Sequence, residues 1–135
     1  MSDSFQLRIV TPTRQLLDES VNEVTAPGTV GEFGVLPEHT TFLSSLEIGA
    51  LSYRAGRSSR RLAIRGGFAE VADDVMTVLA DAAQFAEEID PAQAQSDLQA
   101  ATEKLRDLSP LDEEYTFADA DRRWAEARLA VANQR

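Results

Sequence analysis

Short runs in which apolar and polar residues alternate occupy the first two thirds of the chain. Phe5, Leu7 and Ile9 are separated by single polar residues, a period of two that is typical of a strand with one buried face. Five further runs predict extended segments, one containing Val21 and Val24 and the others at 50–53, 61–65, 68–71 and 75–79. Many short strands separated by turn residues favour a β-sandwich or a flattened barrel.

Two dipeptides mark the expected irregularities of this region. Gly66–Gly67 lies between two of the predicted strands and indicates a break or a bulge, because glycine inside a strand marks an irregular ladder. Asp73–Asp74 stands between the last two strands and predicts the turn that joins them. In the strand before the glycines, the period of two places Leu62 and Ile64 on one face and Ala63 on the other.

In the last third of the chain the apolar period lengthens to about 3.6, which predicts helices. Asp90 is a suitable N-cap residue, and Pro91 fits the first helical position. Ser109–Pro110 ends this helix, and Thr116, with Asp119 as an imperfect capping box, is expected to cap a second one. The two apolar stripes are Ala94, Leu98, Ala101, Leu105 and Leu108, and Phe117, Ala120, Trp124, Ala127 and Val131. Two such stripes joined by a short link predict an antiparallel hairpin.

Glycine usage divides the chain at the same place. All seven glycines lie between Gly28 and Gly67, whereas the stretch after residue 87 has none and is rich in alanine. Glycine-punctuated sequence favours strands and turns, and alanine-rich sequence favours helix. We therefore expect an α+β fold, with an N-terminal β-sandwich or flattened barrel over residues 1–87 and a C-terminal antiparallel two-helix hairpin over residues 88–135.

Composition narrows the functional classes. The chain has no cysteine, which excludes disulfides and thiolate chemistry. Its formal net charge is -10, and this opposes binding to nucleic acid, whose phosphates must be neutralised by basic residues. It also opposes binding to a bare anionic membrane surface. No signal peptide or membrane-spanning run is apparent, so a soluble protein is expected. The acidic run 112–114 is interpreted as a solvated loop.

His39, the only histidine, is the one candidate for acid–base chemistry. A catalytic histidine needs an orienting carboxylate and a nucleophile or substrate, and the sequence offers neither a nucleophile elbow nor a second histidine. A structural histidine in a loop is the preferred interpretation. The loop at 28–34 lacks the residues of a phosphate loop, and the carboxylates lack metal-ligand spacing. The sequence thus predicts no catalytic, metal or cofactor residue, and the glycine-rich loop is expected to present Glu32 to a partner.

Five ordered segments carry a family resemblance. They are Gly31–His39 (GEFGVLPEH), the trio Leu46, Gly49 and Leu51, then Ile64–Val71 (IRGGFAEV), Val78–Asp81 (VLAD) and Glu88–Asp90 (EID). Followed by a helical hairpin, they resemble the epsilon subunit of the F-type (rotary) ATP synthase over nearly the whole chain. The fold that this resemblance implies, a β-sandwich followed by a two-helix domain, agrees with the residue patterns.

The resemblance implies a non-catalytic subunit of the central stalk. Such a subunit binds the gamma subunit and the ring of c subunits, so that ion-driven rotation reaches the catalytic head. In this family the hairpin either folds against the β-domain or extends along gamma toward the catalytic alpha and beta subunits, where it inhibits ATP hydrolysis. The complex is peripheral to the membrane, here expected at the cytoplasmic face of the bacterial inner membrane.

Two groups of partner-binding residues are expected. On the c-ring or gamma side they are Glu32, Phe33 and His39. On the side of the catalytic beta subunit they are Arg122, Arg123 and Arg128. At about 100° per residue, these arginines fall largely off the apolar stripe of the second helix and are expected to remain exposed. The acidic segment that the catalytic beta subunits of the family carry near the rotor is their natural counterpart.

Two positions depart from the family pattern. Glu38 stands where the family usually has glycine before the histidine. Some bacterial members bind ATP through the motif Ile/Leu-Asp-x-x-Arg-Ala at the start of the first helix, and this stretch here reads IDPAQA over 89–94. Gln93 replaces the arginine and removes a fixed pair of donors for phosphate. We therefore expect no cofactor, and weak ATP binding or none.

Two rival hypotheses belong to other classes. A stand-alone module, with the sandwich gripping a small ligand and the hairpin dimerising, predicts a stable free homodimer, whereas a stalk subunit should co-purify with gamma. A small hydrolase that uses His39 predicts activity that is lost in His39→Ala.

Overall fold

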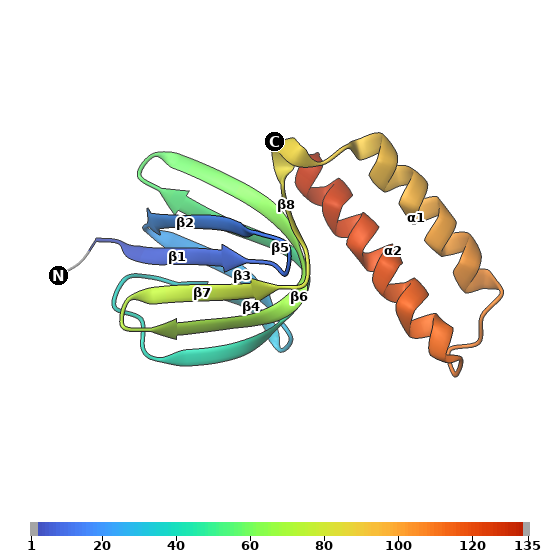
Figure 1. Cartoon of the computed structure of the whole chain (residues 1–135), viewed down its shortest axis with the longest axis horizontal. Helices are drawn as coiled ribbons and strands as arrows, with labels where there is room; N and C mark the ends of the chain where they lie inside the picture. Colours follow the sequence, from blue (N-terminus) through green and yellow to red (C-terminus); the bar gives the residue numbers. More distant parts are fainter. Residues whose placement is uncertain (1–2, 134–135) are drawn as a thin grey trace.

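The computed structural model describes residues 3–133; residues 1–2 and 134–135, the ends of the two predicted parts, lie outside the described residues. Within these residues it contains a β-sandwich followed by two helices that lie side by side, one of which packs against the sandwich (Figure 1). The predicted fold class is confirmed.

Within residues 3–133, eight strands build the sandwich. They are β1 (Phe5–Val10), β2 (Gln15–Val21), β3 (Glu23–Gly28), β4 (Gly31–Val35), β5 (Phe42–Ala55), β6 (Ser58–Ala72), β7 (Val75–Ala80) and β8 (Ala83–Phe85). They form one sheet in the order β2-β1-β7-β6-β5-β3-β4, and β8 pairs with β6. The runs predicted at 61–65 and 68–71 prove to be a single strand, β6, because the glycines between them bend the ladder without ending it.

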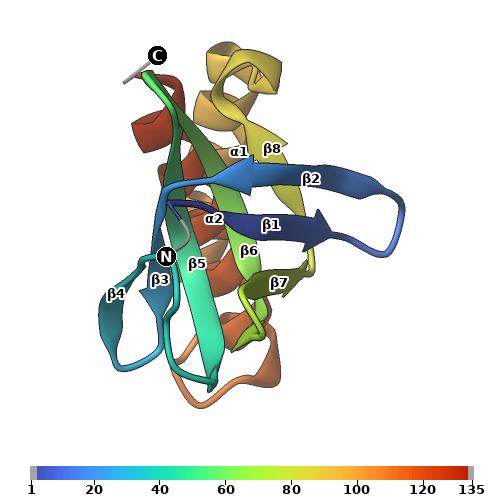
Figure 2. The same ribbon diagram turned by 90° about the vertical axis from the view of Figure 1, so that its left-hand side faces the viewer.

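The long β5–β6 ribbon belongs to both layers of the sandwich. The first half of β6 pairs with β8 through Leu62–Ile64, and the second half pairs with β7 through Gly67–Ala72. β1 pairs in parallel with β7, which joins the β1–β2 hairpin to the second half of β6. Figure 2 shows β1 and β2 running across the long β5 and β6 strands.

The bend of β6 depends on its two glycines. Gly66 and Gly67 have φ angles of +69° and +121°, and a Cβ atom on Gly67 would lie 1.9 Å from the Leu79 carbonyl oxygen. Only glycine fits that close approach of two strands. Asp73 and Asp74 also have positive φ, which confirms the predicted turn between β6 and β7.

Large apolar side chains fill the space between the layers. The fully buried ones include Leu7, Ile9, Leu51, Leu62, Ile64, Met76, Val21, Val24, Val35, Val71 and Val78. As predicted, Leu62 and Ile64 lie in this core and Ala63 points to the opposite face. Ala63 is nevertheless fully buried, because the helices cover that face.

The helices follow a short 3-10 turn, η1 (Ala86–Glu88). In α1 (Pro91–Arg106) the Asp90 carboxylate accepts hydrogen bonds from the amides of Ala92 and Gln93, which confirms the predicted cap. The predicted cap of the second helix at Thr116 is wrong, because α2 (Glu113–Ala132) has its N-cap at Asp112, four residues earlier. Two residues of the run interpreted as a loop, at 113 and 114, form its first turn, where acidic side chains suit the positive end of the helix dipole.

α2 lies between α1 and the sandwich, as Figure 1 shows, and therefore buries residues on two sides. Of its predicted stripe, Trp124, Ala127 and Val131 pack in the contact with the sheet. Phe117 does not belong to the contact and is 65% exposed, whereas Ala118, one position on, is buried. A single stripe cannot describe a helix that has neighbours on two sides.

Gly67→Ala is expected to lower the free energy of unfolding by roughly 3 kcal/mol or more, since the added methyl group meets the Leu79 carbonyl and the φ angle disfavours a side chain. Gly56→Ala is the matched control: φ is +65°, but no atom lies within 4 Å of the added Cβ. It should cost about 1 kcal/mol. Urea unfolding followed by circular dichroism measures both values, and equal losses would contradict the packing argument.

Candidate functional site

α2 docks on β5 and β6 mainly through small side chains. Ala63, Ala86, Ile89, Val131 and Ala132 form a buried cluster, and Ala50, Trp124 and Ala127 pack against it. Alanine buries little surface, so this contact is worth only a few kcal/mol at about 25 cal/mol per Å². The apolar attachment of the hairpin is therefore weak compared with the core of the sandwich.

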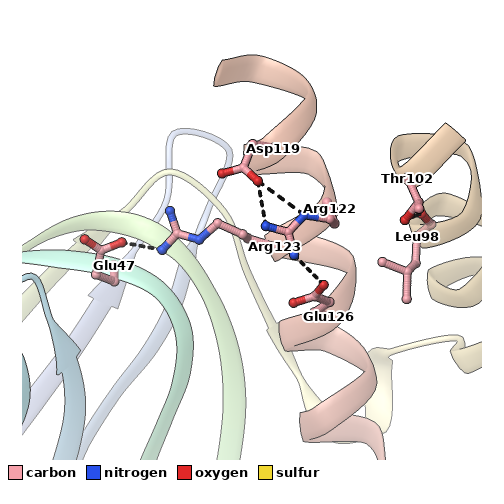
Figure 3. A network of polar contacts seen from close by, with 7 residues as sticks. All are labelled: Glu47, Leu98, Thr102, Asp119, Arg122, Arg123 and Glu126. Atoms are coloured by element: carbon pink, nitrogen blue, oxygen red, sulfur yellow. Dashed lines mark hydrogen bonds and ion pairs between the residues drawn. The ribbon is translucent and has the colours of Figure 1, made fainter. Parts of the chain in front are cut away.

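Among the residues that the structure describes, two ion pairs of opposite polarity cross the same interface. Arg123 of α2 donates to the Glu47 carboxylate of β5 over 2.5 Å, as Figure 3 shows. Arg65 of β6 donates to the Asp121 carboxylate of α2 over 2.7 Å. Glu47 and Arg65 are neighbours at the bend of the β5–β6 ribbon, because Ile48 pairs with Arg65 in the ladder. Each side of the interface thus contributes one cation and one anion.

The other two predicted arginines pair within the hairpin. Arg122 binds Asp119 and Glu126 on α2 itself (Figure 3), and these hydrogen bonds, that to Asp119 above all, raise the pKa of its guanidinium. Arg128 donates to Asp97 of α1 over 2.9 Å, and its side chain is only 11% exposed. The expectation that all three arginines remain exposed is therefore wrong for Arg128 in the docked hairpin.

Asp97 is the main polar link between the two helices. Its carboxylate accepts hydrogen bonds from Gln93, one turn earlier on α1, and from Arg128 on α2. Both hydrogen bonds, first that of Gln93, hold the pKa of Asp97 below its usual value. The Gln93 side chain, singled out for replacing an arginine, is thus engaged within α1.

A cleft of about 400 Å³ lies between the helices. Its charged lining residues include Arg65, Asp97, Asp121 and Arg128. These four already form two ion pairs, Arg65 with Asp121 and Arg128 with Asp97. Within residues 3–133, no three histidine, aspartate or glutamate side chains are grouped to hold a metal ion.

The glycine-rich loop forms the β3–β4 hairpin at one end of the sandwich. Glu32 lies on β4 and is exposed, opposite Pro27 in the ladder. Phe33 is half-buried, and its ring stands edge-on to Phe42 with the centroids 5.0 Å apart. His39 approaches the same Phe42 ring at 5.8 Å. Phe33 and His39 therefore join one aromatic cluster, beside which Glu32 faces solvent.

His39 is held by its own loop. Its Nδ1 lies 2.8 Å from the Thr40 carbonyl oxygen. Glu38, which stands in the usual glycine position, has a φ of +64°, and its amide donates to the Asp74 carboxylate over 2.7 Å. The carboxylate of the β6–β7 turn thereby fixes a backbone conformation that glycine adopts more easily.

The structure shows one surface that the sequence reasoning missed. Leu43 of β5, Phe68 of β6 and Leu79 of β7 are each more than half exposed and lie together on the outer face of the sheet. Phe68 pairs directly with Leu79 across the ladder, and the three side chains line a hollow of about 270 Å³. We call them the outer apolar patch. The signal was present, since strands β6 and β7 have apolar residues on both faces.

Comparison with known proteins identifies the family. Residues 4–86 match the family model for the ATP synthase Delta/Epsilon chain, beta-sandwich domain. Over 99% of its length, the chain is 42% identical to ATP synthase epsilon chain 2 of Syntrophotalea carbinolica and 46% identical to the ATP synthase epsilon chain of Syntrophobacter fumaroxidans. These alignments cover 97% and 99% of the two relatives. The chain belongs to the ATP synthase epsilon-chain family.

Solved structures agree with this membership. The epsilon-family chain aligns with a chain in the cryo-EM structure of the Euglena gracilis mitochondrial ATP synthase, OSCP/F1/c-ring, at a TM-score of 0.83 and 26% identity. That alignment covers 98% of this chain and 83% of the other. A chain from the central stalk and c-ring of the Tetrahymena thermophila enzyme, at a TM-score of 0.63 and 17% identity, supports the fold alone.

Family membership makes the chain an epsilon subunit of the F-type ATP synthase, which is not the catalytic subunit. No helix within residues 3–133 is both long and apolar enough to cross a membrane.

Proposed function

We propose that the chain couples rotation of the c-ring, through gamma, to the catalytic head of the ATP synthase, and that its hairpin inhibits ATP hydrolysis. In this proposal residues 1–87 bind the rotor and residues 88–135 regulate. Membership in the epsilon family supports it, as does the Euglena gracilis structure, which includes F1 and the c-ring. The complex would be peripheral to the cytoplasmic face of the bacterial inner membrane.

The outer apolar patch is the observation that carries the coupling role. Three large apolar side chains that are more than half exposed on one sheet face are unusual in a protein that stands alone, and such a patch marks a surface that a partner covers. The patch lies on the ends of β5 and β6 away from the residues that contact α2. The docked hairpin therefore leaves it free, and we assign it to gamma.

The β3–β4 hairpin is the proposed contact with the c-ring. Val30 at its turn is 98% exposed, and Glu32, two residues further on, is also exposed. Phe33 and His39 hold the base of this hairpin through Phe42, so the turn is presented on a packed support. An exposed apolar residue beside a carboxylate suits the polar loops of a membrane ring.

The weak attachment of the hairpin supports inhibition by extension. Moving a two-state equilibrium from 1:99 to 99:1 takes about 5.5 kcal/mol, which competing interfaces can supply when docking is worth only a few kcal/mol. On extension, Arg122, Arg123 and Arg128 would face the catalytic beta subunit. Those arginines pair inside the docked chain, so extension requires at least some of them to exchange partners.

The replacement of Phe68 and Leu79 by serine should abolish co-purification with gamma, because it removes most of the apolar area of the patch while the sandwich core stays intact. Leu111→Ser, at the exposed tip of the helical hairpin, is the matched control and should co-purify normally. Retention of gamma by the double variant would refute the assignment. A stable free homodimer in its place would favour the rival binding module.

Glu32→Cys, paired with cysteines placed along the polar loop of subunit c, should give a disulfide crosslink in the assembled enzyme. The chain has no cysteine of its own, so every crosslink that includes this chain reports the introduced thiol. Thr13→Cys, on the loop between β1 and β2, serves as the exposed control and should give none. If a scan of the whole c loop yields no product with residue 32, this placement is wrong.

A chain that ends at Glu88 should still assemble and couple, because the residues of the sandwich core all precede the helices. Its complex should hydrolyse ATP faster than the full-length complex. Replacing Arg122, Arg123 and Arg128 together by alanine should release part of the same inhibition. Equal hydrolysis rates with and without the hairpin would show that it is a clamp and not an inhibitor.

A further inference from the structure

We infer that Arg123–Glu47 and Asp121–Arg65 form an electrostatic latch that sets how readily the hairpin leaves the sandwich, and that Glu47 competes with an acidic partner surface for Arg123. The competition rests on the proposed inhibitory function, whereas the latch stands on the structure of the chain alone.

The two ion pairs of the latch lie far from the point about which the hairpin turns. Glu87 pairs with Arg60, and Glu88 pairs with Arg14 over 2.9 Å, so the chain is fastened to the sandwich as far as residue 88. The hairpin must therefore turn about Ile89–Asp90. Asp121 precedes the last residue of α2, which lies near this pivot, by 11 residues, or about 16 Å along the helix. Ion pairs at that distance resist the swing more effectively than contacts beside the pivot.

The apolar contact between α2 and the sandwich is concentrated near Ile89–Asp90 and restrains the middle of α2 less. The buried cluster consists of Val131 and Ala132 of α2, Ala86, Ile89 and Ala63, most of which lie at the pivot end. Farther along α2, Trp124 and Ala127 are only partly buried. The two ion pairs hold the middle of the helix, and their four side chains are between 31% and 58% exposed. Pairs so exposed are screened by salt, which makes the latch adjustable.

Arg123 is the one predicted partner-binding arginine whose counterion lies on the sandwich. The partners of Arg122 and Arg128 are on the hairpin and move with it. When the hairpin swings, Arg123 alone among them loses its carboxylate and becomes available to another. Glu47 thereby holds the docked hairpin on the sandwich. It also pairs with the Arg123 guanidinium, the group that an acidic partner surface would bind.

The test uses a thiol placed under the helix. The chain has no cysteine, and Ala63 is fully buried beneath α2, so Ala63→Cys should react with a maleimide only when the hairpin undocks. In this background, Glu47→Gln and Arg65→Gln should each accelerate labelling about two- to fivefold. Raising NaCl from about 0.05 M to about 0.5 M should accelerate labelling of the parent. The same change should have less effect when Glu47 and Arg65 are both replaced.

Three controls make the result specific. Arg122→Gln removes a neighbouring arginine whose pairs do not cross the interface, and the labelling rate should not change. Ala69→Cys, fully buried in the sandwich core, reports unfolding of the whole domain, and its labelling should not respond to the same changes. The double exchange of Glu47→Arg with Arg123→Glu should restore slow labelling. Parental rates in both Glu47→Gln and Arg65→Gln would overturn the latch.

The assembled enzyme tests the competition. Glu47→Gln frees the hairpin and leaves Arg123 intact, so its complex should hydrolyse ATP more slowly than the parent. Arg123→Gln weakens docking and also removes the cation, so its complex should not hydrolyse ATP more slowly than the parent. Faster labelling with unchanged hydrolysis in Glu47→Gln would overturn the competition and leave the latch standing. Failure of the inhibitory function itself is seen separately, in the truncated chain.

Discussion

The close approach of Gly67 to the Leu79 carbonyl lets one pair of strands serve both layers of the sandwich. With no Cβ at this position, β6 bends and exchanges its partner β8 for β7, while it stays paired with β5 on both sides of the bend. The same bend leaves Glu47 and Arg65 side by side on the outer face, next to Ala50 and Ala63. The constraint that closes the sandwich therefore also builds the surface on which the hairpin rests.

The two faces of the β5–β6 ribbon bury residues of very different size. Inside, Leu51, Leu62 and Ile64 fill the core, and outside, Ala50 and Ala63 meet the alanines of α2. Apolar stabilisation grows with the area buried, so the sandwich holds itself together and the hairpin is held weakly. Ion pairs contribute a larger share to a contact of this kind than to a large apolar one.

The sequence predicted the features that follow from local periodicity and cap chemistry. Alternation around Leu62 and the cap at Asp90 both depend on residues close in the chain, and both were predicted correctly. The start of α2, the exposure of Phe117 and the burial of Arg128 were not, because each depends on which neighbours a helix meets in three dimensions. The outer apolar patch was not predicted either, because apolar residues on both faces of a strand are also typical of a strand that is buried on both faces.

The three arginines show why helical angle alone could not rank them. All were selected because they fall off one stripe, yet each has a counterion in a different part of the molecule. Arg122 keeps its partners whenever α2 remains helical, and Arg128 keeps Asp97 unless α1 and α2 separate. Arg123 loses Glu47 as soon as the hairpin moves as a unit. Of these three arginines, movement of the intact hairpin therefore frees only Arg123 from its counterion, and exposure of Arg128 would require the two helices to part as well.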